Sequence, residues 1–321
     1  MRAHKLRGLR KLPALLALCV TAFTLACGSE HNESRELSDA YAGNAAAAAP
    51  ADTDDFGVAL PQDARHATRV VSLNPAATEA IFAMGADSLL VGRSRWDEFP
   101  PGVSRIKAVG DGIRPNVEAV LAVRPTLVIL YATPDNRSAA EAFRRAGAQT
   151  MTLRVDHIAD FYRLVQQLGV ALGAEKRAAE VSDSVRFTIE RVKRLTDALV
   201  DRPTVVWPAW ESPPMVIGGG SYLDELLTVA GARNVFHDDA NPSPSVSIEE
   251  VARRAPDMVL ASAAGAASIR RSQIWRAVPA VRLGHVLAVN DTLTGRPSVV
   301  LGMAAMHLAR LLHPELADSL R

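Results

Sequence analysis

The feature that most constrains the fold is a long stretch without proline in the middle of the chain, between Asp135 and Arg202. Within it, apolar residues recur at steps of three and four, at positions 181, 185, 189, 192, 195 and 199. This period predicts one amphipathic helix over about residues 174–199, roughly 39 Å long at 1.5 Å per residue. Such a helix is a stiff connection between the parts before and after it, so we do not expect a large hinge closure.

The part before this helix alternates short strands with helices. The strands are predicted at residues 69–73, 89–92 and 127–130, where β-branched and aliphatic residues cluster. Helices are predicted over residues 76–84, ending at Gly85, and from the cap Asn116 to Val123. Alternation of short strands with helices indicates a mostly parallel sheet with helices on its faces.

The part after the long helix repeats this plan. It begins with a strand at 204–207, continues through a turn at Pro213 and Pro214 to a strand at 215–217, and then has a helix capped by Ser221. Residues 117–120 and 125–128 match residues 248–251 and 256–259 at a constant offset of 131 positions. This internal similarity predicts two related α/β units.

These patterns together predict an α/β fold of two three-layer αβα lobes joined by one long α-helix. The N-terminal lobe is expected over residues 66–173, the linker helix over 174–200 and the C-terminal lobe over 201–321.

The N-terminus reads as a targeting segment. Five basic residues precede an apolar run from Leu12 to Ala26, and Thr24-Leu25-Ala26-Cys27 is similar to a bacterial lipobox. We therefore expect a signal peptide over residues 1–26, acylation of Cys27 and a disordered tether over 27–65, which is rich in Ala, Ser, Asp and Glu. Plain secretion or an uncleaved anchor is the alternative, and in it Cys27 has no special role.

Composition excludes several classes of protein. The chain is 48% hydrophobic with a mean hydropathy of +0.06, and it has no second long apolar run, which argues against a polytopic membrane protein. Without residues 1–26, 31 basic residues face 35 acidic ones, a net charge of −4. That balance argues against nucleic acid as a partner. Only Cys27 would remain after signal removal, so a disulfide framework is not expected.

The motif Arg69-Val70-Val71-Ser72-Leu73-Asn74-Pro75-Ala76-Ala77-Thr78-Glu79 carries a resemblance to a known family. Together with residues 91–101, the Asn116 helix and residues 125–129, it resembles the periplasmic binding proteins of cobalamin, haem and ferric-siderophore ABC importers. The similarity covers about residues 68–315 and is greatest to the cobalamin-binding members. It implies two α/β lobes that hold a large metal chelate between them, in the periplasm or cell envelope.

The resemblance also implies ligand contacts. Trp96 and Tyr131 match aromatic contact positions of the cobalamin-binding members, whereas two other aromatic positions of those members are Gly112 and Ser243 here. Ligands of parallel sheets bind beyond the carboxyl ends of the strands. On these grounds the predicted ligand-binding residues are Asn74, Trp96, Tyr131, Trp207, Trp210, Asp291 and Arg296. Packing of the aromatic residues, capping by Asp291 and solvation of Arg296 are the alternatives.

Glu118 and Glu249 occupy equivalent positions of the two units, each two residues after a predicted helix cap. Stabilisation of the helix dipole, worth about 0.3–1 kcal/mol, explains either acid alone but not both at the same place. The resemblance implies that one such acid in each lobe docks onto arginines of the transporter's membrane subunits.

Signals for catalysis or resident metals are weak. The histidines show no paired ligand spacing, Gly218-Gly219-Gly220-Ser221 lacks the ending of a phosphate-binding loop, and no serine lies in a Gly-Xaa-Ser-Xaa-Gly context. The sequence therefore predicts a solute-binding protein of an ABC importer with no cofactor, no catalytic residues and no resident metal site. A corrinoid is the expected ligand, and ferric siderophores and haem are the alternatives. An enzyme or sensor built on the same lobes is the remaining rival.

Overall fold

The computed structural model describes residues 52–62 and 67–320, all of which belong to one compact unit. The predicted signal peptide and Cys27 lie outside the described residues. No helix in the described part of the chain is long and apolar enough to cross a membrane.

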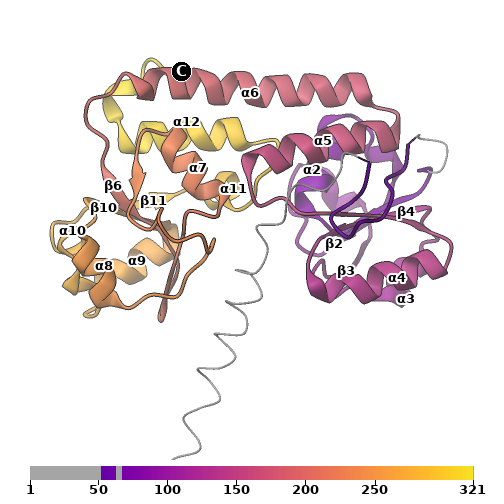
Figure 1. Ribbon diagram of the computed structural model, residues 1–321, viewed down its shortest axis with the longest axis horizontal. Helices are drawn as coiled ribbons and strands as arrows, with labels where there is room; N and C mark the ends of the chain where they lie inside the picture. Colours follow the sequence, from indigo (N-terminus) through magenta and orange to yellow (C-terminus); the bar gives the residue numbers. More distant parts are fainter. Residues whose placement is uncertain (1–51, 63–66, 321) are drawn as a thin grey trace, which may run out of the picture. The chain divides into compact units, whose positions relative to one another are not determined.

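The first lobe is built on a parallel five-stranded sheet with the order β3-β2-β1-β4-β5 (Figure 1). Its strands are β1 (Val70–Ser72), β2 (Leu90–Ser94), β3 (Ala108–Gly110), β4 (Leu127–Tyr131) and β5 (Gln149–Leu153). Its helices are α2 (Pro75–Ala83), α3 (Val117–Ala122), α4 (Arg137–Arg145) and α5 (Ile158–Leu172). Alternate strand residues face opposite layers: Val70 and Ile129 pack with α2 and α5, and Val71 and Leu130 pack with α3 and α4.

The second lobe has a parallel four-stranded sheet with the order β11-β10-β6-β9. Its strands are β6 (Thr204–Val206), β9 (Arg233–Asn234), β10 (Met258–Ser262) and β11 (Val286–Val289). Its helices are α7 (Tyr222–Val229), α8 (Ile248–Arg254), α9 (Ala263–Arg271), α10 (Pro279–Arg282), α11 (Asp291–Thr294) and α12 (Leu301–Leu312). Helices α7 and α12 cover one face, and α8, α9 and α10 cover the other.

The internal similarity seen in the sequence is a structural repeat. In the first lobe β1 lies between β2 and β4, and β5 follows β4; in the second, β6 lies between β9 and β10, and β11 follows β10. Strands β4 and β10 are 131 residues apart at both ends. The same spacing separates Arg124 (φ 48°) and Ala255 (φ 45°), the two non-glycine residues with positive φ among those described. The predicted fold of two αβα lobes is therefore confirmed.

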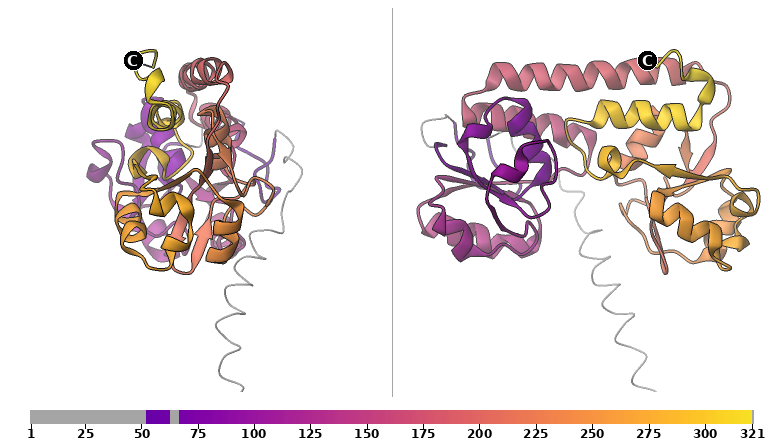
Figure 2. Two further views of the ribbon diagram at one scale, coloured as in Figure 1. Left: turned by 90° about the vertical axis from the view of Figure 1, so that its left-hand side faces the viewer. Right: turned by 180° about the vertical axis from the view of Figure 1, so that it is seen from behind.

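Helix α6 (Glu175–Asp197) is the predicted long helix. Its buried residues include Val185, Ile189 and Val192, spaced by four and three, as an amphipathic helix requires. This face packs against α5 of the first lobe and α12 of the second, and Figure 2 shows the three helices from two further sides. The same apolar core continues through both lobes and α6. Packed side chains therefore join the lobes in addition to the helix that connects them along the chain.

Two expectations differ from the structure. The predicted disordered tether reaches residue 65, but residues 52–62 pack on the edge of the first lobe. Asp54 is fully buried, and its carboxylate accepts hydrogen bonds from Phe56 N, Val58 N and Thr152 N at 2.9, 2.9 and 3.0 Å. Burying this carboxylate is tolerated because these hydrogen bonds replace its hydration. Leu60 adds an apolar contact with the core.

The second difference concerns the strand predicted at 215–217. It does not join the parallel sheet, because β7 (Pro208–Glu211) and β8 (Pro214–Val216) form a separate antiparallel pair. The turn at Pro213 brings these strands directly back on each other, and parallel neighbours would need a long crossover between them.

Candidate functional site

The carboxyl-terminal edges of the two sheets contact each other at the ends of two helices. Asp156 follows β5, and its carbonyl oxygen accepts a 2.7 Å hydrogen bond from the backbone N–H of Tyr222, the first residue of α7. One turn later, the Glu225 carboxylate accepts the N–H of Ile158 at 2.8 Å and lies 2.7 Å from His157 Nδ1. Glu225 from the second lobe therefore caps the first turn of α5 in the first lobe.

A second contact between the lobes is a buried ion pair. Glu79 of α2 is 1% exposed, and its carboxylate accepts hydrogen bonds from Arg296 Nε and from Ser298 Oγ, the latter at 2.6 Å. Arg296 and Ser298 follow α11 in the second lobe. Burial raises the pKa of Glu79, while Ser298 and Arg296 act in the opposite direction. The structure thus places Arg296, a predicted ligand residue, against a first-lobe carboxylate.

Trp96 is an exposed aromatic platform at the carboxyl end of β2. Its side chain is 54% exposed, and the guanidinium carbon of Arg95 lies 4.7 Å from the ring centroid. Asp111 holds Arg95 at 2.5 Å and accepts the Ile113 N–H at 2.8 Å. The Ile113 N–H bond is the main cause that lowers the pKa of Asp111, to which Trp96 and Arg95 also contribute. Because one carboxylate ties these groups together, the indole is held in place before any ligand arrives.

Gly112, at a position where the resemblance implies an aromatic residue, is required by the backbone here. A Cβ at this position would lie 2.3 Å from the carbonyl oxygen of Leu73. The buried side chain of Asn136 locks the same loop, because its Nδ2 donates to the carbonyl oxygens of Gly112 and Tyr131, both at 2.8 Å. No larger side chain fits at 112 unless this loop moves.

Tyr131 ends β4, and its hydroxyl donates to the carboxylate of Asp156. Burial raises the pKa of Asp156, whereas the Tyr131 hydroxyl and Arg154 act to lower it. Tyr131 is half-buried. One face of the first lobe's sheet edge therefore presents a phenol anchored by an acid, next to the point where the lobes meet.

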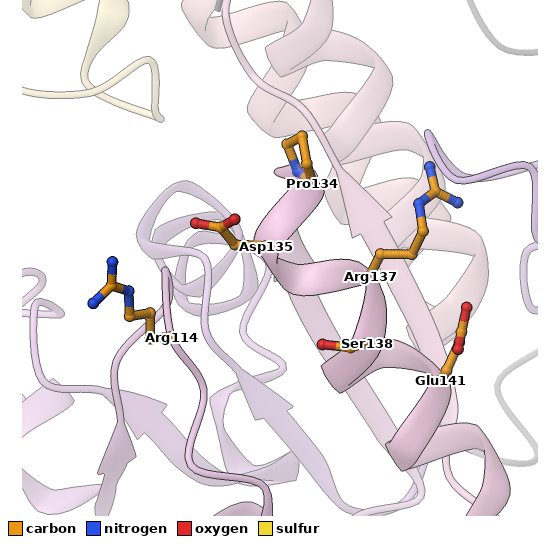
Figure 3. A pocket seen from close by; sticks show the side chains of 6 residues that line it. All are labelled: Arg114, Pro134, Asp135, Arg137, Ser138 and Glu141. Atoms are coloured by element: carbon orange, nitrogen blue, oxygen red, sulfur yellow. The ribbon is translucent and has the colours of Figure 1, made fainter. Parts of the chain in front are cut away.

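A shallow pocket of about 580 Å³ lies beside this edge, where the loop after β3 faces the start of α4. Its lining residues are Arg114, Pro134, Asp135, Arg137, Ser138 and Glu141. Figure 3 shows Asp135 and Ser138 on the side of Arg114, whereas Arg137 and Glu141 extend to the other side of the helix. Arg137 stacks on Phe56, with 4.3 Å from the guanidinium carbon to the ring centroid.

Three predicted residues of the second lobe are placed very differently. Trp207 is only 5% exposed and packs in the core, as the packing alternative predicts. Trp210 on β7 is 60% exposed, and its Nε1 donates to Ser212 O at 3.0 Å. Asp291 is exposed in the first turn of α11, which Asn290 caps.

Asn74 is also a structural residue. It is buried at the start of α2, where its Oδ1 accepts from Ala76 N and its Nδ2 donates to Leu153 O at 3.2 Å. These bonds use both ends of the amide, joining β1, α2 and β5. Asn74 therefore shapes the sheet edge, and its side chain is not presented to a ligand.

Glu118 and Glu249 are exposed at the starts of α3 and α8. Each helix is capped by another residue: Asn116 accepts from Ala119 N at 3.0 Å, and Ser247 accepts from Glu250 N at 3.2 Å. Among the described residues, neither Glu118 nor Glu249 has a hydrogen-bond or ion-pair partner, whereas the adjacent Glu250 binds two arginines. The repeat thus places an exposed acid without a described partner at the equivalent helix start of each lobe.

Sequence reasoning missed Glu79, Glu225, Asp156 and Asn136, which organise the site. Their partners lie up to 219 residues away, so no local pattern marks them. The one available signal was that Glu79 ends the motif around Asn74. Within residues 52–62 and 67–320, no group of three or more His, Cys, Asp or Glu side chains is placed to hold a metal ion.

Comparison with known proteins identifies a family that the sequence matches. The sequence model of the family described as periplasmic binding protein matches residues 70–292. A vitamin B12-binding protein of Vibrio cholerae is 27% identical over 239 residues, 72% of this chain and 84% of that protein. The uncharacterized ABC transporter substrate-binding lipoprotein YvrC of Bacillus subtilis is 25% identical over 254 residues, covering 77% of this chain and 80% of YvrC.

Two solved structures show the same fold. The periplasmic vitamin B12 binding protein BtuF of Vibrio cholerae matches with a TM-score of 0.67 and 22% identity, over 78% of this chain and 98% of BtuF. The periplasmic heme-binding protein RhuT of Roseiflexus matches with a TM-score of 0.68 and 23% identity, over 79% of this chain and 99% of RhuT.

Proposed function

The chain belongs to the periplasmic binding protein family, and from this premise we propose that it is the substrate-binding component of an ABC importer that captures a corrinoid. The family consists of solute-binding proteins, not enzymes. The protein would take up the chelate outside the cytoplasmic membrane and deliver it to the membrane permease. It would need no cofactor of its own.

The observation that carries the proposal is the preorganised Trp96 platform at the contacting sheet edges. An exposed indole held by Arg95 and Asp111 offers a rigid apolar face to a large flat ligand, at the edge where parallel sheets bind ligands. Corrins are large, nearly neutral and fringed with amides, which suits apolar walls with a few polar groups. Relatives named as vitamin B12-binding proteins support the same ligand.

On this proposal the ligand surface comprises Trp96 and Tyr131 from the first lobe and Trp210, Asp291 and Arg296 from the second. Glu118 and Glu249 would dock onto the two permease subunits, since they are exposed, unpaired and related by the repeat. Opposite charges at such rims steer association and fix the register of the two partners.

A haem or a ferric siderophore is the second candidate. Haem and many ferric siderophores carry negative charge, and two arginines are exposed, Arg95 against the Trp96 ring and Arg114 in the loop after β3. Solved structures of similar fold include proteins named as heme-binding. Arg95 is already paired with Asp111, however, so less positive charge is available there than the sequence suggests.

The deciding experiment is an absorbance titration of the purified protein with cyanocobalamin, haemin and a ferric siderophore, followed by gel filtration. We expect cyanocobalamin to co-elute with the protein in a 1:1 ratio and to bind more tightly than the other two. Co-elution of haemin or the siderophore alone would replace the corrinoid by that ligand, and no co-elution at all would contradict chelate binding.

We further propose that Cys27 carries a lipid anchor in the cell envelope. The lipobox-like residues 24–27 support this, and YvrC is a relative named as a lipoprotein. Replacing Cys27 by Ser should release the protein from membranes. A wild-type protein without lipid by mass spectrometry, and a variant that stays with the membrane, would contradict the anchor.

A further inference from the structure

We propose that Glu79 makes the site selective for a neutral, amide-fringed chelate, because it cancels the charge of Arg296 while leaving the terminal amino groups of Arg296 available to the ligand. This inference rests on the proposed function, since it concerns the groups that a bound chelate presents to Arg296.

The first step is the burial of the acid. The side chain of Glu79 lies between α2 and the segment after α11, and its carboxylate accepts hydrogen bonds from Arg296 Nε and Ser298 Oγ. A carboxylate withdrawn from water in this way is stabilised by hydrogen bonds and by a positive partner. Arg296 is the cation bonded to it, so the charge of the guanidinium is already used within the protein.

The pairing with Glu79 occupies only one of the hydrogen-bond donors of Arg296 in the described part of the chain. A guanidinium has five N–H donors and cannot lose its proton. In the described part of the chain only Nε of Arg296 has a hydrogen-bond partner, and the side chain remains 23% exposed. The four donors of its terminal amino groups therefore have no hydrogen-bond partner among the described residues, in the segment that follows β11 and α11. Donors of this kind fit acceptor oxygens on the rim of a ligand.

The acidic groups near Arg296 determine how much positive charge a ligand meets there. Asp97 is a second buried carboxylate, close enough to Glu79 to raise its pKa, although burial is the larger cause of that rise. An anionic ligand group would thus meet a guanidinium whose charge is already balanced by Glu79. A neutral amide oxygen would meet the same donors without needing that charge. Such unfavourable pairing against the wrong ligand is a source of specificity.

Glu225 provides a matched control. It is also a carboxylate that crosses between the lobes, but its partners are Ile158 N and His157, not an arginine. Loss of Glu225 removes a contact between the lobes without changing the charge at Arg296. Any effect common to Glu79→Gln and Glu225→Gln therefore reports on the lobes and not on the ligand's charge.

The test compares two corrinoids of the same shape, cyanocobalamin and a cyanocobalamin monocarboxylic acid in which one side-chain amide is hydrolysed. We expect the wild-type protein to prefer cyanocobalamin by about tenfold, which corresponds to the repulsion of one poorly compensated charge. Glu79→Gln should remove or reverse this preference and should also tighten haemin binding by about tenfold. Glu225→Gln and Glu79→Asp should keep the wild-type ratio.

The outcomes separate the two proposals. If the wild-type protein binds both corrinoids and Glu79→Gln keeps their ratio, or weakens both equally, Glu79 has only a structural role and the inference is wrong. If the wild-type protein binds no corrinoid, the proposed function is wrong and the inference falls with it. Should Glu79→Gln fail to fold, Arg296→Gln provides a second test: it removes the donors proposed to bind the amide oxygen, so the preference for cyanocobalamin should fall, and an unchanged ratio would overturn the inference.

Discussion

The two lobes share a backbone plan but secure it with different chemistry. In the first lobe the Thr126 hydroxyl accepts the N–H of Arg69 at 3.0 Å, just before β1. The residue 131 positions later is Asp257, whose carboxylate accepts the N–H and the hydroxyl of Thr204 at 2.8 and 2.6 Å, at the start of β6. The repeat therefore conserves the position of the hydrogen bond that holds the first strand of each sheet. The acceptor of that bond is a hydroxyl in the first lobe and a titratable carboxylate in the second.

The carboxyl edges of the lobes differ more than their cores. The first lobe adds β3, and the loop after it holds Asp111, which fixes the Trp96 platform. The second lobe has no strand in that place and instead carries the β7–β8 pair with Trp210. Strand order is set by packing that both lobes need, whereas the loops and strands at the edge can differ because the core does not depend on them.

The largest effect should come from reversing the charge of the two equivalent exposed acids, Glu118 and Glu249. Glu118→Lys with Glu249→Lys should abolish most ligand uptake by cells, because like charges would then face each other at both permease subunits. Each single reversal should cause a similar, smaller loss. Ligand affinity of the purified double variant should stay close to wild type, since both acids are exposed and neither is among the residues proposed to contact the ligand.

Asp183→Lys is the matched control for this experiment, because it reverses an exposed acid on α6 and should leave uptake unchanged. The measurement is corrinoid uptake in cells that lack the native protein, with equal amounts of each variant confirmed by immunoblot. Normal uptake by a well-expressed double variant would show that the acids only stabilise their helices.

The next effect concerns the aromatic residue that each lobe exposes. Trp96→Ala should weaken corrinoid binding by about 1–3 kcal/mol, as the loss of an aromatic anchor does. Trp210→Ala should cost less, about 1 kcal/mol, because its indole lacks the clamp that holds Trp96. Phe187→Ala removes an exposed aromatic residue from α6 and should change nothing. Isothermal titration would show whether one lobe or both hold the ligand; an unchanged affinity for Trp96→Ala would make Trp96 a packing residue.

A fall in pH should weaken the hydrogen bond from Thr204 to Asp257 in the second lobe, but not the bond from Arg69 to Thr126 in the first. Hydrogen bonds from Thr204 lower the pKa of Asp257, so this carboxylate stabilises the fold at a pH above its unfolded pKa. That stabilisation is lost as the pH falls through the lowered folded value. Asp257→Thr should therefore cost about 1 kcal/mol of unfolding free energy at neutral pH, and this cost should shrink as the pH falls below the unfolded pKa of about 3.9.

Thr126→Asp is the reciprocal exchange, and it should make the first lobe acid-sensitive where the wild type is not. Urea unfolding of both variants and the wild type, followed at neutral and acid pH, provides the comparison. If the cost of Asp257→Thr were the same at both pH values, the carboxylate would not be the stabilising group.

The smallest effect should be equal in the two lobes. Arg124 and Ala255 have left-handed backbone angles at the ends of α3 and α8, where glycine avoids the clash of a Cβ. Arg124→Gly and Ala255→Gly should each raise the unfolding free energy by up to about 1 kcal/mol, reduced by the extra freedom of glycine in the unfolded chain. Thermal unfolding measures both; a gain at only one site would mean that the two helix ends are not equivalent.

Local patterns were sufficient for the repeated architecture. The apolar period of α6, the caps Asn116, Ser221 and Ser247 and the 131-residue offset are all visible within short windows, because helix and strand periodicity arise from neighbouring residues. The family resemblance came from the motif around Asn74 for the same reason. Trp96 lies just after β2, as the sequence indicates, whereas Trp210 lies within β7 of the antiparallel pair; the ligand contacts of both stay predictions.

What only the tertiary structure decided is which polar groups are already occupied. The sequence presents Arg296 as an available cation and Trp207 as an accessible indole, whereas the fold pairs Arg296 with Glu79 and buries Trp207 in the core. It also orders residues 52–62, which composition alone assigns to the tether, through hydrogen bonds to Asp54 and Thr152. These outcomes depend on contacts between residues about 100 or more positions apart. No period or composition encodes such contacts, because chain entropy is overcome only when both lobes have folded around them.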